Sequence, residues 1–247
     1  MNKILLTQPQ PISEQRKYEE ISNKYNVKFE AIPFVQLELI NSRELRQQQV
    51  IVSEYEGILF YSVGIVDLFF RLCNELKLTI HPDVKYFCIN ENVAYYLQKY
   101  ITYKKRRVFF GNNSFDALTE QFNKFKEIKY LLPITDQHNS EKTKDLNKFN
   151  LNVKFFKVSN TVYCDLKNLN INDYDMIIFY TPSDVLSFLK SFPNFKKKNI
   201  LIGACGNRTY ETIKKNKIQV DLNAPTEKCP SIITAIENIL QKKLKQK

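Results

Sequence analysis

The stretch Glu54-Tyr55-Glu56-Gly57-Ile58-Leu59-Phe60-Tyr61-Ser62 decides the fold, because the chain repeats it as Asp173-Tyr174-Asp175-Met176-Ile177-Ile178-Phe179-Tyr180-Thr181. In both copies an acidic turn leads into a short apolar run, and a hydroxyl residue follows. A short apolar run between polar turns is typical of a parallel strand that helices cover on both faces. The repeat therefore predicts two strand–turn–helix units, 119 residues apart.

Helix signals follow each copy of the repeat. Thr181 precedes Pro182 and Asp184 in the pattern of a helix N-cap, a first helical residue and a near capping box. Ser62 is the expected N-cap of the first copy. Apolar residues then recur at helical spacing, as Ile65, Leu68, Phe69, Leu72 and Leu76 and as Val185, Phe188, Leu189 and Phe192.

Other strand–turn–helix units extend this alternation along the chain. We expect further strands to begin near Lys3, Tyr86, Arg107, Lys129 and Ile200. An alternation of strands and helices predicts an α/β protein with parallel sheets and right-handed crossovers.

Two extended segments, residues 27–40 and 153–163, interrupt the alternation and contain no turn. We interpret them as two crossings between domains that run side by side. The prediction is two similar parallel-sheet α/β domains, joined by a pair of extended crossing strands, with a ligand cleft between them. The expected domains are residues 1–34 plus 164–247 and the insert 41–157, with crossings at 35–40 and 158–163.

The net charge of the chain is +11, so the protein attracts anions such as nucleic acid, an acidic membrane surface or a small polycarboxylate. Its basic runs include Lys104-Lys105-Arg106-Arg107 and Lys196-Lys197-Lys198. Neither is interleaved with aromatic residues, and no helix-turn-helix or zinc module is visible. We therefore expect no nucleic-acid partner and interpret the runs as solvated surface.

The five cysteines lack CxxC spacing, which favours reduced thiols in a cytoplasmic protein over a disulfide framework. The two histidines are far apart, so a metal site is not expected. The apolar run Ile4–Leu6 is too short for a signal peptide or a membrane span. We expect a cytoplasmic protein that does not insert into a membrane.

Several motifs, in this order and spacing, resemble the uroporphyrinogen-III synthase family over essentially the whole chain. They are Ile4-Leu5-Leu6-Thr7-Gln8-Pro9, Ile32-Pro33-Phe34-Val35, Gly57-Ile58-Leu59-Phe60-Tyr61-Ser62, Ile178-Phe179-Tyr180-Thr181-Pro182-Ser183, Ile202-Gly203-Ala204-Cys205-Gly206-Asn207-Arg208-Thr209 and Ala224-Pro225-Thr226.

The resemblance implies a lyase of tetrapyrrole and haem biosynthesis. Such an enzyme cyclises the linear tetrapyrrole hydroxymethylbilane to uroporphyrinogen III, with loss of water and inversion of the last pyrrole ring. It uses no cofactor and no metal. The substrate is a small polycarboxylate, which suits a basic protein, and we expect a monomer.

The resemblance and the polar turns at helix N-termini together suggest the site residues, because such turns offer backbone N–H groups to carboxylates at the carboxyl ends of strands. The expected catalytic residues are Tyr163 and Thr209. The expected substrate-binding residues are Thr7, Tyr61, Ser62, Asn92, Thr161, Thr181, Ser183, Gly206, Asn207 and Arg208.

The chain departs from the family pattern at two places. Ser159 stands where the family usually has a tyrosine, and Tyr163 is the candidate to replace that tyrosine. A glycine- and threonine-containing turn of the family becomes Asn90-Glu91-Asn92-Val93. These departures motivate an alternative, a catalytically decayed member that acts as a binding or interaction protein.

Overall fold

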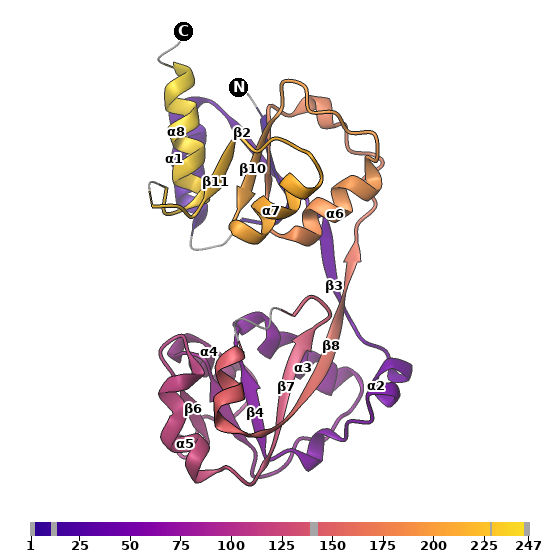
Figure 1. Cartoon of the computed structure of the whole chain (residues 1–247), viewed down its shortest axis with the longest axis vertical. Coiled ribbons are helices and arrows are strands. Elements are labelled where there is room, and N and C mark those ends of the chain that lie inside the picture. Colours follow the sequence, from indigo (N-terminus) through magenta and orange to yellow (C-terminus); the bar gives the residue numbers. More distant parts are fainter. Residues whose placement is uncertain (1–2, 11–13, 139–142, 228, 245–247) are drawn as a thin grey trace. The chain divides into compact units, whose positions relative to one another are not determined.

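The computed structural model describes residues 3–10, 14–138, 143–227 and 229–244. The chain forms two compact units: unit 1 is Met1–Gln36 with Val162–Lys247, and unit 2 is Leu37–Thr161. The chain passes between them in β3 (Val35–Leu39) and in β8 (Asn152–Tyr163). These two strands are neighbours in one sheet (Figure 1). The predicted extended segment 27–40 is not continuous, because residues 32–34 divide it into β2 (Lys28–Ala31) and β3, which belong to different sheets.

Unit 1 contains a five-stranded sheet in which every hydrogen-bonded pair of strands is parallel. The strand order across the sheet is β11 (Leu222–Ala224), β10 (Leu201–Cys205), β9 (Met176–Phe179), β1 (Lys3–Leu6) and β2 (Lys28–Ala31). The helices of this unit are α1 (Gln15–Tyr25), α6 (Pro182–Ser191), α7 (Asn207–Lys215) and α8 (Ile232–Leu244).

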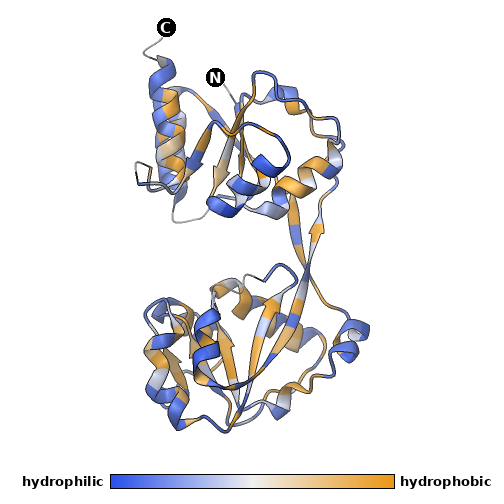
Figure 2. Ribbon diagram, viewed as in Figure 1, coloured by the Kyte–Doolittle hydropathy of each residue, from blue (hydrophilic) through white to orange (hydrophobic). Residues whose placement is uncertain are grey.

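Helices cover both faces of the unit 1 sheet. Ile4 and Leu6 pack in a core with residues of α1 and α8, whereas Leu5 packs on the opposite face with residues of α6 and α7. Successive strand residues point to opposite faces, so a strand that is buried on both sides must be apolar throughout. Figure 2 shows this pattern, with largely apolar strands and helices that are polar on one side.

Unit 2 contains a six-stranded sheet in the order β3, β8, β7 (Lys129–Thr135), β4 (Gly57–Phe60), β5 (Lys85–Cys88) and β6 (Val108–Phe110). The pairs from β8 to β6 are parallel. The α-helices are α2 (Ser42–Gln48), α3 (Val63–Glu75), α4 (Glu91–Tyr96) and α5 (Thr119–Lys124). Short 3-10 helices cover Val52–Glu54, Leu97–Lys99, Phe115–Leu118 and Lys144–Phe149, and unit 1 has one at Ile171–Asp173.

The two predicted strand–turn–helix repeats are β4–α3 and β9–α6. All four residues of β4 and all four of β9 are buried. Ser62 caps α3, and Thr181 caps α6 through a capping box with Asp184. The predicted fold class, two α/β units built on parallel sheets, is confirmed. No helix in the described ranges is long and apolar enough to cross a membrane.

Candidate functional site

The strand order of unit 1 reverses between β1 and β9. From β1 the chain moves through α1 to β2 on one side, and from β9 it moves through α6 and α7 to β10 and β11 on the other. Open parallel sheets bind ligands in the crevice at the carboxyl ends of the strands where such a reversal occurs. Thr7 directly follows β1 and Tyr180 directly follows β9, so both lie at this position.

The buried carboxylate of Asp184 hydrogen-bonds to residues on both sides of the switch point of unit 1, which is the place between β1 and β9 where the strand order reverses. Its Oδ2 atom accepts hydrogen bonds from Thr7 Oγ1 at 3.0 Å, Gln8 Nε2 at 3.2 Å, Tyr180 N at 3.2 Å and Thr181 N at 2.8 Å. The Asp184 N–H in turn donates to Thr181 Oγ1 at 3.2 Å. One side chain therefore ties the residues after β1 to the turn after β9.

Burial dominates the electrostatics of Asp184, which is 0% exposed. Removal from water raises the pKa of this carboxyl, although the hydrogen bonds from Thr181, Thr7 and Gln8 act to lower it. A buried carboxylate that receives several hydrogen bonds is costly to disturb, because its donors would lose their partner as well.

The turn between β10 and α7 lies at the same edge of the unit 1 sheet. Gly206 has a φ of +85°, a conformation that glycine adopts readily, and its N–H donates to the Ala224 carbonyl at 2.7 Å. No side chain caps the N-terminus of α7, and Asn207 and Arg208 in its first turn are exposed. Thr209 is 2% exposed, and its hydroxyl donates to the Tyr180 carbonyl at 3.2 Å.

Three predicted site residues of unit 1 have buried side chains: Thr7, Ser183 and Thr209. The Thr7 and Thr209 hydroxyls hydrogen-bond within the unit, and Ser183 lies in the first turn of α6. These three side chains therefore lie beneath the surface of the turns that follow β1, β9 and β10. The predicted residues at the exposed surface of this edge are Asn207 and Arg208.

The strand order of unit 2 reverses between β4 and β7. Tyr61 follows β4, and its ring centroid is 5.3 Å from that of His138, which lies beyond β7. Burial raises the pKa of Tyr61 to about 12, against the opposing effect of a hydrogen bond with the Thr135 backbone, so its phenol is protonated at neutral pH. Ser62 caps α3 by accepting from the Ile65 N–H at 3.4 Å.

The remaining predicted residues lie near the ends of other strands. The Thr161 N–H and hydroxyl both donate to Asp136 Oδ1, at 2.9 Å and 2.7 Å. Tyr163, at the end of β8, is half-buried, and Lys190 Nζ lies 5.7 Å from its ring centroid. Asn92 is exposed in the first turn of α4.

Sequence reasoning did not include Gln8, Asp136, His138 or Asp184 among the site residues, although the structure places all four beside predicted ones. Signals for two of them were visible, since Gln8 lies in the opening motif and Asp184 in the capping box. Across the described residues, no group of three or more His, Cys, Asp or Glu side chains could hold a metal ion.

Two parallel-sheet α/β units, each with polar turns at its switch point, define a class of ligand-binding α/β proteins. Within that class the chain belongs to the uroporphyrinogen-III synthase family, because the family model described as uroporphyrinogen-III synthase HemD matches residues 19–234. The enzyme is therefore a cyclising lyase of tetrapyrrole biosynthesis that acts on a small-molecule substrate.

Solved structures have the same fold. Uroporphyrinogen-III synthetase from Helicobacter pylori is 16% identical, with a TM-score of 0.63, and the match covers 98% of this chain and 100% of that one. A mutant uroporphyrinogen III synthase from the extremely thermophilic bacterium Thermus thermophilus is 10% identical, with a TM-score of 0.53 and coverage of 100% of both chains. No curated protein matches the sequence significantly.

Proposed function

We propose that the chain converts hydroxymethylbilane to uroporphyrinogen III and binds the carboxylates of this substrate at turns that follow the carboxyl ends of strands in its units. The observation that carries the binding proposal is the N-terminus of α7. It has no side-chain cap, it follows a glycine with positive φ, and exposed Asn207 and Arg208 flank it. These are the features of a carboxylate site built from backbone N–H groups and one cation.

The turn at Tyr180 and Thr181 has a supporting role in this proposal. Asp184 already occupies the N–H groups of both residues, so they are not available to an anion. Thr209 links this turn to α7 through its hydrogen bond to the Tyr180 carbonyl. The hydrogen bonds around Asp184 therefore fix the position of the N-terminus of α7 at the edge of the sheet.

The proposed cyclisation does not require a strong nucleophile or base from the protein. The substrate ionises by itself when its hydroxymethyl oxygen leaves as water, and the protein has to fold the chain of pyrroles and stabilise spread charge. We propose that the phenol of Tyr163 donates a hydrogen bond to the leaving oxygen. The half-buried place of Tyr163 at the end of β8 supports this, because Lys190 Nζ lies 5.7 Å from its ring centroid and a cation over the ring helps to hold it in place.

In unit 2 the proposed binding groups are the phenol of Tyr61, the turn at Ser62 and the exposed Asn92. The phenol of Tyr61 is protonated at neutral pH, so it can donate a hydrogen bond to a carboxylate. Thr161 and Asp136 hold each other at the end of β7, and we assign Thr161 a supporting role there.

We also propose that the protein acts as a monomer in the cytoplasm and has no nucleic-acid partner. The unpaired state of all five cysteines supports a reducing compartment. Light scattering of the purified protein tests the monomer, with a mass near 29.2 kDa as the expected result. A stable dimer would contradict it.

Two measurements test the proposed function. Freshly made hydroxymethylbilane should yield isomer III in the presence of the protein, and isomer I alone would contradict the reaction. Calorimetry with the product uroporphyrinogen III tests the site. Arg208→Gln should weaken binding about tenfold at low salt, whereas the matched surface change Lys242→Gln should leave it unchanged.

A further inference from the structure

The basic run Lys196-Lys197-Lys198, between α6 and β10, has no place in the reaction described above. Lys197 Nζ pairs with Asp221 Oδ1 at 2.6 Å, and both side chains are largely buried. Lys196 and Lys198 are exposed and line a hollow of about 540 Å³. The charge of Lys197 is therefore paired inside the fold, whereas the charges of Lys196 and Lys198 line the hollow.

The hollow lies at the amino ends of the strands of unit 1. Its lining includes Ile171 in the short 3-10 helix that precedes β9, Ile200 just before β10, and Ser191 at the end of α6. Thr7, Tyr180 and Gly206 follow the carboxyl ends of β1, β9 and β10 instead. The hollow is therefore separate from the switch-point turns of the same unit.

An apolar wall forms one side of the hollow. Ile171 and Ile200 are each 8% exposed. The rings of Phe192 and Phe195 pack on fully buried Phe188, with centroid distances of 5.1 Å and 4.9 Å. Since Phe188 belongs to the core, these two rings are held in place before anything binds.

We propose that this hollow binds a small organic anion with an apolar body, its anionic group against Lys196 and Lys198 and its body against Phe192 and Phe195. Small-molecule pockets commonly enclose about 300–1,000 Å³, with apolar walls and a few charged groups. Among the described residues, no ion pair involves Lys196 or Lys198. Asp173, which follows the lining residue Asn172 in the sequence, accepts a hydrogen bond from Asn170 Nδ2 at 2.7 Å.

The same lysine pair would attract either a free carboxylic acid or an aromatic sulfonate, because the shared chemistry is an anion attached to an apolar group. This proposal is independent of the cyclisation reaction, so its test is a binding measurement. The probes are anilinonaphthalene sulfonate, whose fluorescence rises in apolar surroundings, and octanoate as a competitor.

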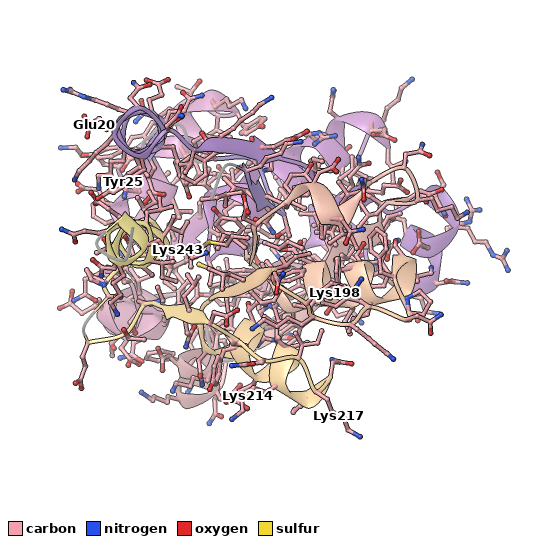
Figure 3. The ribbon with its side chains drawn as sticks, turned by 90° about the horizontal axis from the view of Figure 1, so that it is seen from above. Glu20, Tyr25, Lys198, Lys214, Lys217 and Lys243 are labelled. Carbon is pink, nitrogen blue, oxygen red and sulfur yellow. The ribbon has the colours of Figure 1, made fainter. Side chains whose placement is uncertain are left out.

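The matched variants remove the same charge from two places. Lys196→Gln with Lys198→Gln removes two charges from the hollow. Lys242→Gln with Lys243→Gln removes two from α8, which packs on the other face of the unit 1 sheet. Figure 3 shows Lys198 and Lys243 on different elements of this unit. Urea unfolding checks that both double variants are as stable as the original protein.

We expect the first double variant to bind anilinonaphthalene sulfonate about tenfold more weakly and the second to bind it as the original protein does. Octanoate should displace the probe, and the neutral N-phenyl-naphthylamine should be insensitive to both variants. Equal weakening in the two double variants would overturn the proposal, since only net charge would then matter. Unchanged binding in the first, or weakening by Arg208→Ala instead, would overturn it as well.

Discussion

At the turn between β9 and α6 the third helical residue is Asp184, whereas at the equivalent turn between β4 and α3 it is Ile65. Asp184 accepts hydrogen bonds from residues on both sides of the switch point of unit 1. Ile65 packs in the apolar core of unit 2, and the cap there is one bond of 3.4 Å to Ser62.

This difference shows that one residue of a repeated unit can change how its turn is connected to the neighbouring strand. The same strand, N-cap and helix form in both copies, since these depend on the shared pattern. In unit 1 the side chain of Asp184 ties the turn to the residues after the neighbouring strand, Thr7 and Gln8. Across the switch point of unit 2 the ring of Tyr61 contacts that of His138, and its phenol hydrogen-bonds with the Thr135 backbone.

The largest expected effect comes from giving unit 1 the residue of unit 2. Asp184→Ile should lower the free energy of unfolding by about 3–5 kcal/mol, because buried donors at Thr7, Tyr180 and Thr181 lose their acceptor. Urea unfolding measures the change. Ile65→Val is the control and should cost about 1 kcal/mol. Equal losses in the two variants would remove the distinction between the turns.

Activity should respond next most strongly to the two expected catalytic residues, Tyr163 and Thr209, and to the expected substrate-binding residue Ser183. Tyr163→Phe, Thr209→Ala and Ser183→Ala should each lower turnover by about one to two orders of magnitude without abolishing it. In our proposal each variant loses a hydrogen bond that supports the reaction, worth about 1–3 kcal/mol, and tenfold in rate is about 1.4 kcal/mol. A folded variant with no turnover at all would reveal a dedicated acid or base that this account lacks.

Arg208→Ala should act on binding more than on turnover, raising KM about tenfold at low salt. Its effect should shrink as salt increases, because the exposed guanidinium and the substrate carboxylates are screened. Steady-state kinetics at two salt concentrations measure this. An effect on kcat that does not depend on salt would contradict the carboxylate role of α7.

The pH dependence of stability should also distinguish the two turns. Burial raises the pKa of Asp184 above its value in the unfolded chain, so the folded protein binds this proton more tightly. The contribution of this group to stability is therefore greatest at low pH and falls as pH rises through the raised pKa. The stability of Asp184→Asn relative to the original protein should rise over that window. No rise would mean that the pKa is not raised.

The smallest expected effect concerns the two N-caps. Thr181→Ala should cost about 1–2 kcal/mol, because its capping bond of 3.2 Å belongs to a capping box. Ser62→Ala should cost about 0.5 kcal/mol, because its bond is 3.4 Å long and stands alone. Thermal unfolding of the two variants compares them, and a larger loss at Ser62 would reverse the ranking of the turns.

The local features of both turns were predictable from the sequence. The strands, the helices and the caps at Ser62 and Thr181 all follow from short-range patterns. The role of Asp184 was not predictable from the sequence, because its partner Thr7 lies 177 residues away in the chain. Likewise, a pattern that places Thr7 after a strand, and Ser183 and Thr209 in the first turns of helices, does not say whether their side chains are buried or exposed. The structure shows them buried.

The product isomer tests the central claim most directly. Hydroxymethylbilane closes spontaneously to isomer I, so the protein is added to freshly made substrate and the isomers are resolved over time, with heat-denatured protein as the control. Isomer III should dominate with the native protein, and Tyr163→Phe should form the same isomer more slowly. Isomer I alone, at the rate of the denatured control, would contradict it.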